Sequence, residues 1–152
     1  MKVLVVIVGV VLLVFLIVQV FAMSSRNKIE EYAYTVVKKY ENFEVRNYES
    51  GLFTSVKMPT NNYQQASSAG FRVLAGYIFG GNSKQQKIAM TSPVAMTLED
   101  SMTMMFMVPK DLSKKDLPEP NSSDITFKEE PQKTVAAITF GGWANDANTS
   151  KS

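Results

Sequence analysis

Methionine is the residue type whose placement first suggests chemistry in this sequence. Six of the nine methionines lie between Met90 and Met107. If this stretch ends in a strand, side chains alternate, so Met104 and Phe106 share one face while Met105 and Met107 share the other. Both faces are then apolar, and such a strand is central in a sheet or lines a pocket. Because thioethers adapt their shape, the cluster can be core, the wall for a flat apolar ligand, or both.

Aromatic and cationic side chains could complete such a pocket. The aromatic residues that could stack on a ring system are Phe71, Tyr77, Tyr48 and Trp143. Core packing is the alternative interpretation for them. The cations that could pair with ligand carboxylates are Arg72, Lys84 and Lys87. They could equally be solvated surface charges, so the residues alone leave both interpretations open.

Several kinds of chemistry are excluded by composition. The 152 residues include no cysteine and no histidine, which excludes disulfides, cysteine nucleophiles, Ser-His triads, and iron or zinc held by those residues. The net charge is only +2, and aromatic RNA-binding motifs are absent, so we expect no nucleic-acid partner. No tuned acid–base pair stands out, so we predict a protein that is not an enzyme.

An apolar segment begins the chain. Residues Val3 to Val18 are all apolar or glycine, and Gln19 is the first interruption. A helix over 3–22 would be about 30 Å long, the thickness of a bilayer's hydrocarbon core. The length favours a single-pass membrane anchor with the following domain outside the cytoplasm. A signal peptide cleaved near Val20–Ala22, giving a secreted protein, and a buried core helix remain as alternatives.

The rest of the sequence predicts an α+β domain with strands around one main helix. Three early strands, which suggest an antiparallel meander, are expected near 34–40, 43–48 and 52–58. Later strands are expected within 88–98 and near 102–108, 125–129 and 134–140. The helix is indicated by residues at spacings of three and four, namely Ala66, Ala69, Gly70, Val73, Leu74, Tyr77 and Ile78. Asn61 or Asn62 can cap its start, and Gly80 can end it.

Several motifs follow one another in a specific order between residues 32 and 145. They are Tyr34–Val37, Phe43–Tyr48, Phe71–Asn82, Lys87–Val94, Met105–Pro109, Leu117–Pro120 and Phe140–Trp143. Together they resemble the SOUL haem-binding family, and the apolar leader resembles that of its membrane-anchored bacterial members. The resemblance implies a distorted antiparallel β-barrel flanked by helices, a fold shared with effector-binding domains of the gyrase-inhibitor type.

The resemblance also implies a function and a site. It implies non-catalytic binding of haem or a related tetrapyrrole in an apolar groove beside the helix, with basic side chains meeting the propionates. The residues expected to contribute are Phe71, Arg72, Leu74, Tyr77, Ile78, Lys87 and Met90. Without histidine, an iron ligand could come only from methionine or tyrosine. We therefore expect no metal site of the chain's own, and weak binding through apolar contact.

The family pattern continues beyond this sequence. Its second helix and closing strands have no counterpart before Ser152. We therefore expect an incomplete second half, with open barrel edges that could self-associate. The expected organisation is an anchor or signal at 1–23, a linker at 24–33, the domain at 34–145 and a disordered tail at 146–152. Alternative functions are an interaction or scaffold module without ligand, and a small-molecule hydrolase of the effector-binding fold.

Overall fold

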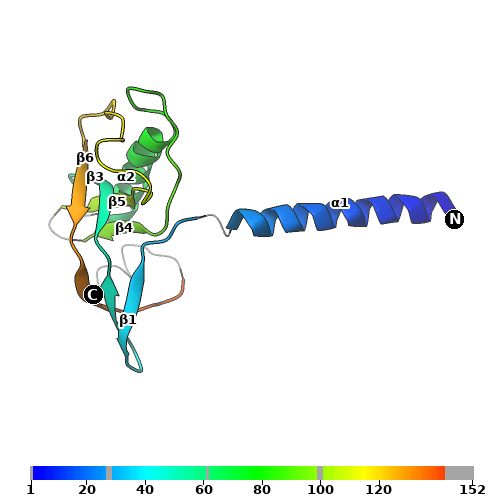
Figure 1. Cartoon of the computed structure of the whole chain (residues 1–152), viewed down its shortest axis with the longest axis horizontal. Helices are drawn as coiled ribbons and strands as arrows, with labels where there is room; N and C mark the ends of the chain where they lie inside the picture. Colours follow the sequence, from blue (N-terminus) through cyan, green and yellow to red (C-terminus); the bar gives the residue numbers. More distant parts are fainter. Residues whose placement is uncertain (1, 27–28, 61, 99–100, 143–152) are drawn as a thin grey trace.

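The fold combines two helices with seven strands in the described part of the chain (Figure 1). The computed structural model describes residues 2–26, 29–60, 62–98 and 101–142. The elements in chain order are α1 (Lys2–Arg26), β1 (Tyr34–Lys39), β2 (Glu44–Tyr48), β3 (Gly51–Lys57), α2 (Tyr63–Ile78), β4 (Val94–Thr97), β5 (Thr103–Met107), β6 (Ile125–Glu130) and β7 (Lys133–Ala137). The α+β class is therefore confirmed, whereas Trp143 and the predicted tail at 146–152 lie outside the described residues.

The strands form two antiparallel sheets, with orders β1-β2-β7 and β4-β5-β3-β6. The expected barrel is therefore not found in the described residues, where the two sheets do not close on each other. The predicted meander is also wrong in its third strand, because β3 pairs with β5 and β6 rather than with β2. The physical reason is burial: residues 53–56 of β3 are all buried. Only a central position in the larger sheet covers both faces of such a strand.

Helix α2 begins and ends where local chemistry directs it. The Asn62 side chain accepts a hydrogen bond from the Gln65 backbone N–H at 2.8 Å and so caps the first turn. After Phe79, Gly80 adopts a φ of 113°, a left-handed conformation that stops the helix. The buried residues are Ala66, Gly70, Leu74, Ala75, Tyr77 and Ile78. Five of them belong to the predicted stripe, whose other two members, Ala69 and Val73, are only partly buried.

A glycine lets α2 lie close to the larger sheet. The helix packs against β3 and β5. A Cβ atom added at Gly70 would lie 3.1 Å from the Cβ of Met104 and 3.3 Å from its sulfur. A larger residue at position 70 would therefore push α2 away from β5.

Strand β5 carries an apolar cluster on each of its faces. Met104 and Phe106 belong to the core beneath α2, together with Leu74 and eight other buried residues. Met105 and Met107 pack with Phe53 on the opposite face. The predicted central strand with two apolar faces is confirmed, and these methionines are mainly core residues.

Helix α1 stands apart from the two sheets (Figure 1). Its side chains are described for residues 7–19. The large apolar side chains from Ile7 to Val18 are 50% to 62% exposed. In the part of the chain that the structure describes, no helix combines the length and the apolar character needed to cross a membrane.

The segment immediately before β1 is docked on the domain. The Tyr32 backbone N–H donates to the Ser92 carbonyl, and the Ser92 N–H donates to the Glu30 carbonyl, both at 2.8 Å. The Tyr32 ring lies 5.2 Å from Phe53, edge-on, and its hydroxyl donates to the Glu49 carbonyl at 2.8 Å. This part of the predicted linker therefore has a fixed place against both sheets.

Candidate functional site

A groove of about 450 Å³ lies between α2 and strands β4 and β5. We call it the helix groove, and its lining residues are Tyr63, Ser67, Ser68, Phe71, Val94, Met96 and Met104. Three of the helical residues are spaced four apart, which places them along one face of α2. On the sheet side, Met96 and Met104 are cross-strand partners. One wall of the groove is thus a face of α2, and the other is formed by the paired strands β4 and β5.

The helix groove is uncharged. Among the described residues that line it, none carries a formal charge at neutral pH. Phe71 is 41% exposed, and its ring packs edge-on to Phe106 at a centroid distance of 5.4 Å. The core thus holds one side of this ring, and the rest remains available to a ligand. A ligand here would gain free energy mainly by burying apolar area, at about 25 cal/mol per Å².

The seven predicted binding residues do not come together in this groove. Only Phe71 lines it. Leu74, Tyr77 and Ile78 are 0%, 1% and 4% exposed, in the core beneath α2. The Tyr77 hydroxyl donates to the Pro118 carbonyl at 2.9 Å, and burial raises the pKa of Tyr77 to about 12. These three side chains could contact a ligand only if the core opened.

The other three predicted residues lie on the surface. Arg72 and Lys87 are exposed. Met90 is also exposed and lines a different pocket, of about 490 Å³, together with Glu30 and Lys110. The structure therefore separates Met90 from Phe71, although the sequence analysis expected them to share a groove.

Sequence reasoning missed most of the groove. The residues not predicted are Tyr63, Ser67, Ser68 and Val94, whereas Met96 and Met104 belong to the methionine cluster that was considered as a possible ligand wall but were not among the seven predicted binding residues. The spacing of Tyr63, Ser67 and Phe71 was available as a signal, because residues four apart share a helix face. The pairing of Met96 with Met104 was not available, since it depends on the register between two strands.

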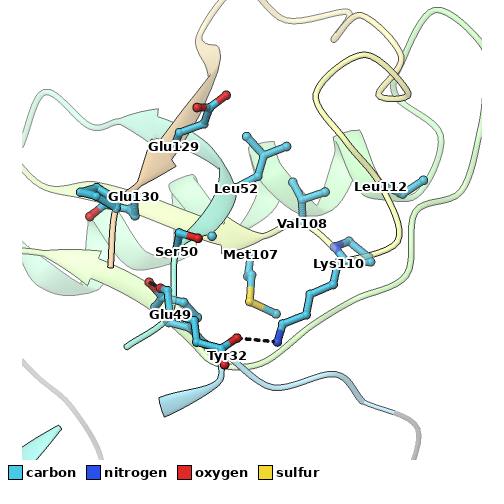
Figure 2. A pocket seen from close by; sticks show the side chains of 13 residues that line it. Tyr32, Glu49, Ser50, Leu52, Met107, Val108, Lys110, Leu112, Glu129 and Glu130 are labelled. Carbon is cyan, nitrogen blue, oxygen red and sulfur yellow. Dashed lines mark hydrogen bonds and ion pairs between the residues drawn. The ribbon is translucent and has the colours of Figure 1, made fainter. Parts of the chain in front are cut away.

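A larger pocket, of about 600 Å³, lies where the ends of β3, β5 and β6 meet the docked segment (Figure 2). We call it the junction pocket. Its lining residues are Tyr32, Glu49, Ser50, Gly51, Leu52, Met107, Val108, Pro109, Lys110, Leu112, Glu129, Glu130 and Pro131. In contrast to the helix groove, it has charged walls.

The charges of the junction pocket are partly paired. The Lys110 ammonium lies 3.0 Å from a Glu49 carboxylate oxygen, as the dashed line in Figure 2 shows. Glu130 lies 2.7 Å from both Lys128 and Lys133, and hydrogen bonds from these two lysines lower its pKa. Burial raises the pKa of the Tyr32 phenol.

The described residues thus define an α+β domain in which one helix covers a four-stranded sheet and leaves an apolar groove at its edge. The family model described as SOUL heme-binding protein matches residues 29–152. The chain belongs to the SOUL heme-binding protein family, which confirms the resemblance found in its motifs.

Curated relatives agree with this family. The chain is 30% identical over 114 residues to heme-binding protein 1 of Xenopus laevis, covering 70% of this chain and 60% of that protein. It is 28% identical over 111 residues to heme-binding protein 2 of Mus musculus and of Homo sapiens, covering 68% of this chain and 54% of each relative. The chain therefore matches little more than half the length of these relatives.

Proposed function

We propose that this domain binds haem or a related tetrapyrrole in the helix groove without catalysing a reaction. The observation that carries the proposal is the uncharged apolar lining around Phe71, Met96 and Met104, in a chain of the SOUL family. The names of the curated relatives as heme-binding proteins support the same ligand class. A flat macrocycle would rest on the exposed part of the Phe71 ring and on the partly buried side chain of Met96, with Met104, which is 3% exposed, forming the floor behind them.

The lining suits the macrocycle better than it suits the iron. The chain has no histidine or cysteine, and the described residues contain no group of carboxylates able to hold a metal ion. The lining atoms able to ligate iron are the Met96 and Met104 sulfurs and the Tyr63 hydroxyl oxygen. Arg72 follows Phe71 and is exposed, so it could pair with a propionate. Binding would thus depend mainly on apolar contact.

A hemin titration tests this proposal. Saturable binding would shift the Soret band, and Phe71→Ala should weaken binding about tenfold because the ligand loses an aromatic contact. Phe79→Ala is the matched control, since Phe79 is exposed just after the same helix but lies outside the groove. Equal losses in both variants would contradict the placement. A spectrum of free hemin at micromolar protein would instead favour a scaffold module, and turnover of an ester panel would favour a hydrolase.

We also propose that residues 3–22 tether the domain to a membrane, with the domain outside the cytoplasm. The uninterrupted apolar run in the sequence and the exposure of residues 7–18 support this proposal. The expected result is that the intact chain resists alkaline extraction from membranes and is cleaved by protease added to whole cells. Recovery of the intact chain, leader included, in the soluble fraction would contradict the tether.

Self-association is a further part of the proposal. Among the described strands, β1 and β7 each pair on one side only. Exposed apolar side chains lie on or after them, including Val37 and Phe140. Unpaired edges of this kind can pair with another chain. Sedimentation of the chain at several concentrations should show association that a lysine at Val37 reduces, whereas a monomer at all concentrations would contradict it.

A further inference from the structure

We propose that the junction pocket is a second binding site, which takes a small organic cation with an apolar body, such as an arylalkyl amine. It is separate from the proposed tetrapyrrole groove, and the two share no lining residue. The proposal therefore goes beyond haem binding, and its test can fail while that function stands.

The pocket has an apolar wall that could hold the body of such a ligand. Leu52, Val108 and Leu112 lie near one another in Figure 2, and Met107 lies below them. The Tyr32 ring, which belongs to the docked segment, forms another side of the pocket. That ring is fixed by its contacts with Phe53 and Tyr48, at centroid distances of 5.2 Å and 4.9 Å. The wall is therefore already in place before a ligand arrives, which lowers the entropic cost of binding.

The charges around this wall favour a positive head group. The lining holds three carboxylates and one ammonium. Glu130 is already neutralised by two lysines from outside the lining. Glu129 is exposed, and in the described part of the chain it makes no ion pair. A ligand ammonium would find this carboxylate available.

The carboxylate of Glu49 already binds an ammonium group, that of Lys110. The Lys110 ammonium lies 3.0 Å from the Glu49 carboxylate, and both side chains are about half exposed or more, with 54% and 61% of their surface accessible. Such an exposed pair is weak, so a ligand ammonium could replace Lys110 there. An anionic ligand would instead meet Glu49 and Glu129 with repulsion. The pocket thus discriminates against the propionates of a tetrapyrrole.

Three probes with one shared body test the charge preference. They are 4-phenylbutylamine, 4-phenylbutanol and 4-phenylbutyrate, titrated calorimetrically against the full chain in a neutral detergent. We expect the amine to bind most tightly and the carboxylate least, with amine affinity falling as salt is added. Equal binding of amine and carboxylate, or no saturable binding of the amine, would overturn the proposal.

Substitutions with opposite expected signs make the test specific. Glu129→Gln and Glu49→Gln should each weaken amine binding about threefold, whereas Lys110→Met should strengthen it about threefold by freeing Glu49. Glu41→Gln is the matched control, because Glu41 is exposed in the β1–β2 turn outside the pocket. Weaker amine binding in Lys110→Met would overturn the assignment. Thermal melts establish that each variant is folded, and an unchanged hemin titration separates this site from the helix groove.

Discussion

The helix groove and the junction pocket differ more in charge than in size. The groove has about 450 Å³ and uncharged walls, whereas the pocket has about 600 Å³ and four charged side chains in its lining. Met96 and Met104 of the groove belong to the core beneath α2, and so do Leu52, Val108 and Leu112 of the pocket, whereas Tyr32 and Met107 of the pocket pack on the other face of the larger sheet. The comparison teaches that volume alone does not select a ligand here. On the two proposals made above, the uncharged groove takes a flat apolar ligand and the charged pocket takes an organic cation.

The largest expected change is in the free energy of unfolding and concerns Leu74, which the sequence analysis placed in the binding site and the structure places in the core. Leu74→Ala should lower the free energy of unfolding by about 3 kcal/mol, because it leaves a cavity in a fully buried position. Chemical denaturation measures this loss. In the fraction that remains folded, hemin affinity should match that of the parent chain. A large loss of affinity with little loss of stability would show that Leu74 belongs to the binding surface after all.

A smaller change in stability is expected at Gly70, and this substitution should affect ligand binding in the helix groove but not in the junction pocket. Gly70→Val should cost about 2 kcal/mol of stability and weaken hemin binding, because its side chain pushes on Met104 in the groove. Amine binding in the junction pocket should not change. Gly76→Ala is the control: an added Cβ meets nothing within 4 Å, so this change should stabilise the helix by about 0.5–1 kcal/mol. Equal stability changes in both variants would contradict the close approach of α2 to β5.

The smallest expected change is in thermal stability at the junction pocket, where the contribution of the Glu130 ion pairs depends on pH. Hydrogen bonds from Lys128 and Lys133 hold the pKa of Glu130 below its ordinary value, so their stabilisation is present above pH 4.5 and disappears as pH falls through the lowered pKa. Glu130→Gln should therefore lower the melting temperature by roughly 3 °C at pH 7. The two chains should converge at strongly acidic pH. A difference that persists there would contradict the ion-pair explanation, and Glu41→Gln should show no difference at either pH.

Some of this fold could be read from the sequence because the signals were local. The Asn62 cap, the stop at Gly80 and the alternation along β5 each depend on neighbouring residues, and all three were found as predicted or among the predicted options. The motif order also identified the family. By contrast, the place of β3 depended on which distant strands could cover both of its faces, which no local pattern reveals.

The candidate site was predicted less well for a related reason. Leu74, Tyr77 and Ile78 are on the apolar stripe of α2, and the same stripe serves either a core or a ligand. In this chain it serves the core. The groove instead uses the neighbouring helix face, where two serines lie between Tyr63 and Phe71 and give a weak apolar signal. Its other wall follows from the pairing of Met96 with Met104, a contact between strands.

The docking of Glu30 and Tyr32 against Ser92 limits how far the domain can move from its leader. Helix α1 ends at Arg26, and the first of these contacts is made by Glu30, so only three residues lie between them. Three residues reach at most about 11 Å when fully extended. With α1 in a bilayer, as proposed, the short connection would keep the domain close to the membrane surface. A poorly soluble pigment could then pass between membrane and protein over a short path through water.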